Sequence, residues 1–229
     1  MLFKFLAKQL MTSLFIALKI IPMIFMALFP VVNPVGTALV LDGMSRGVDE
    51  QSWKAMSRKI ALYSFLLLSF FFFLGSYILK LFGISIPIVQ LSGGVVLALM
   101  GWQLLNQKEN NDPVSNEELE KHTRSIDPKA FYPFTFPLTI GPGGLAVVLT
   151  FSAHLDRESR LLLTLEQGAA TVGIFLMCLV VMVCYSNLKF MTKRFSASGA
   201  LAVSKILAFF VLCIGVEIAW AGFKALGVH

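Results

Sequence analysis

Long apolar runs, separated by short polar segments, set the pattern of this chain. They cover residues 10–41, 60–81, 88–105, 131–154, 161–187 and 200–225. A helix needs roughly 20 apolar residues to cross the hydrocarbon core of a bilayer. The pattern therefore predicts an all-α membrane protein with six transmembrane helices in one integral membrane domain, 1–229.

Composition supports this prediction and excludes a soluble domain. Of the 229 residues, 57% are hydrophobic and 14% are charged, and the mean hydropathy is +0.79. A soluble domain carries about 25% charged residues, so a globule this apolar could not cover itself with polar surface. The three cysteines lie inside apolar runs and show no metal-ligand spacing, so they predict neither a disulfide framework nor a metal site.

The net charge of +6 does not indicate nucleic acid as a partner, because the basic residues do not form a stripe. Instead they lie between the apolar runs, and more of them fall in segments 42–59, 106–129 and 189–194 than on the opposite side. Lys and Arg are retained in cytoplasmic loops, so this distribution predicts that both termini lie outside the cytoplasm.

The first and fourth apolar runs share a disruption. Phe29-Pro30 is followed by Asn33-Pro34-Val35-Gly36, and Phe136-Pro137 is followed by Gly141-Pro142-Gly143-Gly144, about half the chain later. Because each half crosses the membrane three times, an odd number, the second half begins on the opposite side and is inverted relative to the first. Many secondary transporters have this plan. We therefore predict two inverted three-helix repeats, 1–105 and 131–229, joined by a polar loop, 106–130, with broken helices 1 and 4.

Each predicted break frees backbone N–H and C=O groups at membrane depth, where an unpaired group costs several kcal/mol. Such groups survive only inside protein or beside a wet cavity. Two breaks at matching positions most simply line one cavity near the midplane. The residues that we expect to bind a substrate there come from both breaks: Asn33, Pro34, Gly36, Thr37, Thr139, Gly141, Pro142, Gly143 and Gly144.

The disrupted segments, together with the turn at 82–87 and Ser92-Gly93-Gly94, resemble the MarC family of bacterial inner-membrane proteins over nearly the whole chain. The resemblance implies six spans, an inner-membrane location and membership of a group classed as neutral amino acid transporters. The loop at 106–129 and the extended N-terminus look like additions to the family pattern.

Asn33 has two roles that the sequence leaves open together. Its amide can donate and accept hydrogen bonds to a substrate. It can also cap a half-helix that begins at Pro34, because Asn favours the N-cap and Pro the first helical position. If half-helices begin at Pro34 and Pro142, their free N–H groups and their dipoles would suit a carboxylate.

Lys205 and Glu217 are charged residues in the interior of the sixth apolar run. Glu217 is a candidate for ion coupling, because a charged group within a membrane helix is costly unless it has a function. Lys205 is expected to extend its amine towards the membrane surface. Gln90 and Glu166 lie near span ends, where we expect them at the interface.

Two functions remain open from sequence. The first is a secondary transporter of small neutral solutes, amino acids among them, with coupling to protons or sodium and a homo-oligomeric state both undetermined. The second is a non-transporting assembly or regulatory subunit of the membrane. Rings of charge that would favour a channel are missing from the spans. The sequence also holds no nucleotide-binding loop and no Ser–His or paired-Asp arrangement, so we expect no cofactor and no enzyme activity.

Overall fold

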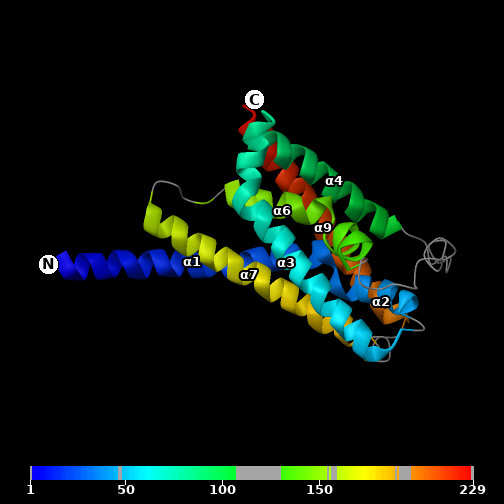
Figure 1. The fold of residues 1–229 in the computed structure, drawn as a ribbon. Helices are drawn as coiled ribbons and strands as arrows, with labels where there is room; N and C mark the ends of the chain where they lie inside the picture. The colour runs from blue at the N-terminus through cyan, green and yellow to red at the C-terminus, as the bar shows by residue number, and fades with distance from the viewer. Residues whose placement is uncertain are drawn as a thin grey trace.

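A computed structural model describes residues 2–45, 48–106, 130–153, 155, 159–188, 190 and 197–227. Its elements are helices that form an elongated bundle (Figure 1). In chain order they are α1 (Leu2–Val32), α2 (Pro34–Met44), α3 (Glu50–Leu81), α4 (Ile86–Asn106), η2 (Ala130–Thr139), α6 (Pro142–Ala153), α7 (Arg160–Ser186) and α9 (Ala197–Ala225).

Most helices begin and end within a few residues of the predicted bounds, but α1 begins at Leu2 and α3 at Glu50, about ten residues earlier than predicted. Capping residues mark several of the helix ends. Asp49 caps α3, because its carboxylate accepts a hydrogen bond from the Ser52 backbone N–H at 2.8 Å. Hydrogen bonds from the side chain and the backbone of Ser52 lower the pKa of Asp49. Ser159 caps α7 in the same way. Gly83, with φ of 68°, turns the chain between α3 and α4, in a conformation that glycine adopts without strain.

The number of spans is confirmed only in part. Within the described residues, four helices are long and apolar enough to cross a membrane, and they lie in α3, α4, α7 and α9. A fifth span results if η2 and α6, which are bent by 71° at their junction, count as one. The first segment contributes a shorter apolar helix, Ala17–Val32. The predicted polar loop lies, at 107–129, outside the described residues.

The first segment differs from the prediction at Pro30, which belongs to the predicted disruption but does not interrupt the helix. Helix α1 continues through Pro22 and Pro30, and the chain leaves helical geometry only at Asn33. A proline inside a membrane helix is tolerated where neighbouring helices and local adjustments satisfy the freed backbone groups. At its N-terminal end α1 extends beyond the bundle (Figure 1).

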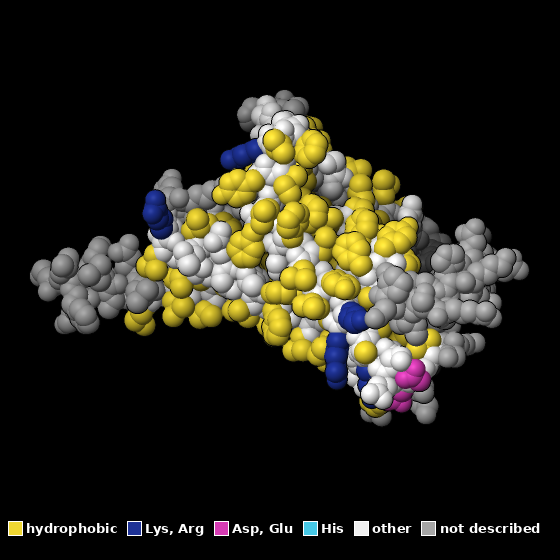
Figure 2. Space-filling view, in the orientation of Figure 1, with side chains coloured by type: hydrophobic (Ala, Val, Ile, Leu, Met, Phe, Trp, Pro, Cys, Tyr) yellow, Lys and Arg dark blue, Asp and Glu magenta, His cyan; other side chains and the backbone are white. Residues whose placement is uncertain are grey.

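Hydrophobic side chains cover the middle of the face shown in Figure 2, and charged side chains lie towards its edges. The exposed apolar residues come from several helices, among them Leu66, Leu99, Phe175 and Phe209. A soluble protein rarely exposes so wide an apolar surface, whereas lipid covers it without cost. The outer surface is therefore that of a bilayer-embedded protein.

The most extensive helix contact joins α4 to α9, which lie side by side in Figure 1. Glycines bring the two backbones together: a Cβ on Gly94 would lie 2.3 Å from the Ala219 nitrogen, and one on Gly215 would lie 2.3 Å from the Ala98 nitrogen. Gly101, further along α4, meets Leu212, which comes earlier in α9, so the helices are antiparallel. Small residues are what allow such close packing in lipid.

Lys205 adds a polar link to this pair. Its amine on α9 donates hydrogen bonds to the carbonyls of Leu104, at 2.9 Å, and Leu105, at 2.6 Å. These carbonyls belong to the last turn of α4, where helical donors run out and a cation is favourable. Lys205 thus caps the end of the neighbouring helix.

Gly215→Ala is expected to lower the thermal unfolding midpoint of the detergent-purified protein by several degrees. The added methyl group would overlap the Ala98 backbone, which cannot move aside without separating the helices. The matched control is Gly168→Ala on α7, where a Cβ has nothing within 4 Å. This control should leave the midpoint unchanged or raise it, because Ala is the better helix former. Equal midpoints for the two variants would contradict the role given to the α4–α9 contact.

Candidate functional site

The first break lies between α1 and α2. Asn33 joins them with φ of 45°, a left-handed conformation that Asn tolerates better than most residues. Its side-chain oxygen accepts a hydrogen bond from the Gly36 backbone N–H at 3.1 Å. A Cβ on Gly36 would lie 2.4 Å from the Asn33 amide nitrogen, so the cap needs glycine at this position. The predicted capping role of Asn33 is confirmed.

The second break lies between η2 and α6. Tyr132 and Phe136 adopt extended backbone angles inside η2, as residues before proline commonly do. The wide turns are held by the hydroxyls of Thr135 and Thr139, which donate to carbonyls five residues earlier, both at 2.7 Å. Helix α6 then begins at Pro142, as the sequence predicts.

The two breaks lie against each other. Gly143, in the first turn of α6, approaches Val31 at the end of α1 so closely that a Cβ would lie 3.3 Å from a Val31 methyl group. On its other side it meets Leu97 of α4. The starts of the two half-helices therefore share one neighbourhood inside the bundle.

Tyr185, near the end of α7, connects the two breaks. Its side chain is completely buried, and its hydroxyl lies 3.1 Å from the Thr139 hydroxyl of the second break. The Thr37 side chain, one turn after the first break, lies close to the same hydroxyl, while its own hydroxyl donates to the Val32 carbonyl at 3.3 Å. A buried tyrosine hydroxyl needs such partners, because leaving it unpaired costs free energy. Three hydroxyls from three elements thus meet at this point.

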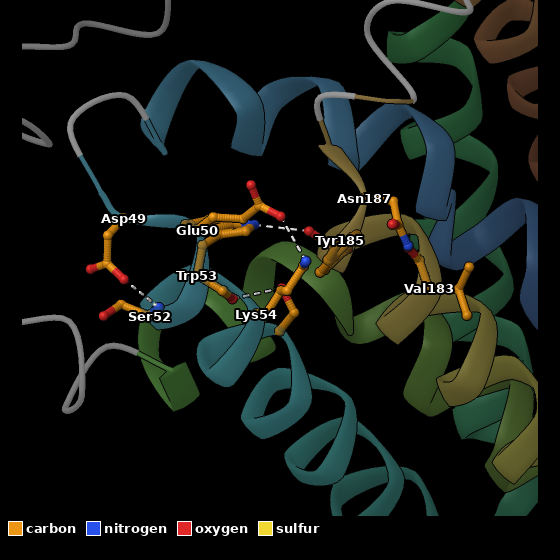
Figure 3. Close-up of polar contacts among 9 residues, drawn as sticks. Asp49, Glu50, Ser52, Trp53, Lys54, Val183, Tyr185 and Asn187 are labelled. Atoms are coloured by element: carbon orange, nitrogen blue, oxygen red, sulfur yellow. Dashed lines mark hydrogen bonds and ion pairs between the residues drawn. The ribbon is translucent and has the colours of Figure 1, made fainter.

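Trp53 of α3 closes the cluster on one side. Its indole N–H donates to the Tyr185 carbonyl at 2.8 Å, and both residues are buried (Figure 3). Its ring meets that of Phe134 edge-on, with centroids 6.4 Å apart. Sequence reasoning missed Trp53 and Tyr185. The available signal was a Trp and a Tyr near the ends of apolar runs, which is also the usual pattern of interface anchors.

The predicted substrate-binding residues differ in accessibility. Pro34, Thr139, Gly143 and Gly144 are buried; Asn33, Gly36, Thr37 and Gly141 are partly buried; Pro142 is exposed. Pro34 and Pro142 bring no N–H group, so the carbonyls four residues earlier lack their usual helical donor. The first-turn N–H groups of α2 and α6 have no helical acceptor. The breaks thus offer donors, acceptors and hydroxyls, while segments 29–37 and 136–144 contain no charged residue.

Both breaks lie within a match between this chain and a known family. The sequence model described as "MarC family integral membrane protein" matches residues 18–226, nearly the whole chain. This chain belongs to the MarC family. The resemblance inferred from the broken segments is therefore confirmed, as is its consequence that the protein is a multi-pass membrane protein.

Three relatives illustrate how widely the MarC family is spread among bacteria. The membrane protein YvbG of Bacillus subtilis is 24% identical, over 89% of this chain and 93% of its own length. A membrane protein of Aquifex aeolicus is 26% identical, over 90% and 92%. The inner membrane protein MarC of Escherichia coli is 25% identical, over 83% and 87%. These relatives support a bacterial inner-membrane location. No solved structure matches the chain.

The two acidic candidates of this MarC-family chain lie on α7 and α9 rather than on the segments that form the breaks. Glu217 is exposed on the outer surface of α9. Its role in ion coupling therefore stays a prediction. Glu166 in α7 and Gln90 in α4 are buried, with 7% and 5% of their surface accessible, and their interfacial depth stays a prediction. Within the described residues, no group of three or more His, Cys, Asp or Glu could hold a metal ion.

Asn33→Ala is expected to destabilise the protein by about 2 kcal/mol, because alanine loses the cap and also strains the left-handed backbone. Asn33→Gly should cost less than about 1 kcal/mol, since glycine adopts this conformation freely and is itself an acceptable cap. Thermal unfolding of the purified variants measures the difference. If both variants lose the same stability, the backbone conformation at Asn33 does not carry the strain assigned to it.

Proposed function

We propose that this MarC-family protein is a secondary transporter of small neutral solutes, with amino acids as the leading class, that works by alternating access around the two breaks. The observation that carries this proposal is the hydroxyl cluster of Thr37, Tyr185 and Thr139, which links both broken segments inside the bundle. A break that only bent a helix would not need a buried polar connection to another break.

The chemistry of the breaks favours a neutral or zwitterionic solute. A carboxylate would be bound mainly by the N–H groups at the start of α6, where the helix dipole adds positive potential, because the Asn33 side chain already accepts from the Gly36 N–H at the start of α2. An amine would be bound by the carbonyls that Pro34 and Pro142 leave without a helical donor. Because neither break carries a charged side chain, a solute with net charge would remain uncompensated.

The pairing of the helices supports two inverted repeats with six spans. The first broken segment packs on α7 of the second half, and the second broken segment packs on α3 of the first half. Helix α4 meets its counterpart α9 in an antiparallel contact, and α3 meets its counterpart α7. This exchange of partners is what a pseudo-two-fold axis would produce. In transporters with this plan, one repeat rocks against the other around the central site.

The decisive experiment is solute flux into liposomes that contain the purified protein. Labelled glycine and alanine are tested first, with and without a proton or sodium gradient, against empty liposomes. We expect protein-dependent uptake of at least one of them. No flux across a broad panel of amino acids, together with a stable co-purifying membrane partner, would contradict the transporter and favour an assembly subunit.

Tyr185→Phe is expected to reduce flux about 3- to 10-fold, the effect of losing one hydrogen bond in the transport cycle. The variant keeps the ring and the backbone carbonyl that Trp53 binds, so the fold should persist. Tyr77→Phe is the matched control, because Tyr77 lies on α3 with 67% of its surface exposed. Unchanged flux in Tyr185→Phe would remove the hydroxyl cluster from the mechanism.

A further inference from the structure

One face of α3 runs alongside the second break. Trp53 on this face meets Phe134 of η2, and Leu68 meets Gly144 of α6, whose Cβ would lie 4.0 Å from a Leu68 methyl group. Residues at spacings of three, four, seven or eleven share one face of a helix. Ser64 lies eleven residues after Trp53 and four before Leu68, so it belongs to the face between those two contacts.

The Ser64 hydroxyl is buried without a hydrogen-bond partner in the described part of the chain. The residue is 0% exposed. Leaving a buried hydroxyl unpaired costs free energy, so a native structure retains one only where something compensates for it. The position of Ser64 therefore needs an explanation.

Other serines in this chain show the ordinary solution. The Ser57 hydroxyl donates to the Trp53 carbonyl at 2.9 Å, and the Ser92 hydroxyl donates to the Ile88 carbonyl at 2.8 Å. Both bonds return to the carbonyl four residues earlier, as serines in membrane helices commonly do. Ser57 is two turns away on the same face of α3. Ser64 does not make this bond, and its hydroxyl stays available to another group.

We propose that Ser64 lines the solute pathway at the second break and that its hydroxyl binds the polar group of the solute. This inference rests on the proposed transport function. The hydroxyl can accept from an ammonium group and donate to a carboxylate or carbonyl, so it suits the same zwitterionic class as the break itself. The full desolvation of Ser64 makes this bond strong and selective, because a site whose polar group goes unpaired rejects the wrong solute.

Cysteine labelling tests the pathway without requiring knowledge of the solute. Ser64→Cys is made in a chain whose Cys178, Cys184 and Cys213 are replaced by alanine, and is treated in liposomes with a small water-soluble methanethiosulfonate reagent. Only a hydrated thiol ionises and reacts. Because alternating access would admit water to the break when the pathway opens, we expect Ser64→Cys to react at least about tenfold faster than the matched control Ser69→Cys.

Ser69 is a close control because its hydroxyl is also buried and unpartnered among the described residues of the same helix. It lines a different feature, an open apolar depression of about 510 Å³ on the outer surface beside Phe70 and Phe131. That depression faces lipid, so the thiol of Ser69→Cys should stay unreactive. Labelling of Ser64→Cys at the slow rate of Ser69→Cys would overturn the proposal, whether or not the protein transports alanine.

Alanine flux provides the second readout. Ser64→Ala should raise the alanine concentration for half-maximal flux about 3- to 10-fold, while Ser69→Ala leaves it unchanged. Because Ser64→Ala removes an unpaired buried hydroxyl, its thermal stability should match or exceed the wild type, so a loss of affinity would not reflect misfolding. An unchanged half-maximal concentration would overturn the solute contact. Fast labelling with no flux in the wild type would instead refute the transporter and leave Ser64 on a hydrated path.

Discussion

Every peptide group inside a bilayer must find a partner within the protein, and this constraint shapes the whole molecule. Unbroken helices meet it by themselves. At its two interruptions the chain meets it with small side chains: the Asn33 amide caps α2, and threonine hydroxyls return to carbonyls in the wide turns of η2. Interruptions that are supported this carefully are retained features of the fold rather than tolerated defects.

The second organising element is the backbone contact between α4 and α9, and it has a different character from the region of the breaks. Glycines bring the backbones of the two helices into direct contact. Around Tyr185, by contrast, side chains make the contact: hydrogen bonds and aromatic rings join α7, η2 and α3. The fold thus combines a close backbone contact with a polar centre built from side chains.

The sequence predicted local features well. The apolar runs fixed the helices to within a few residues, apart from the N-terminal extension of α1 and the earlier start of α3, and the prolines located the half-helix starts at Pro34 and Pro142. Distant partners escaped prediction, because nothing local indicates that Tyr185 reaches Thr139 or that Trp53 bonds to the Tyr185 carbonyl, 132 residues away. At Pro30, inside α1, the sequence predicted an interruption that the structure does not have, because whether a proline breaks a membrane helix depends on its neighbours.

The link between Lys205 and the last turn of α4 bears on how the protein is made. The carbonyls of Leu104 and Leu105 enter the membrane about 100 residues before the amine that binds them has been synthesised. Until α9 inserts, the carbonyls at that helix end must accept hydrogen bonds from water or lipid headgroups, and the glycine face of α4 has no helix packed against it. The first half of the chain is therefore an unfinished intermediate during translation, and maturation waits for the final helix.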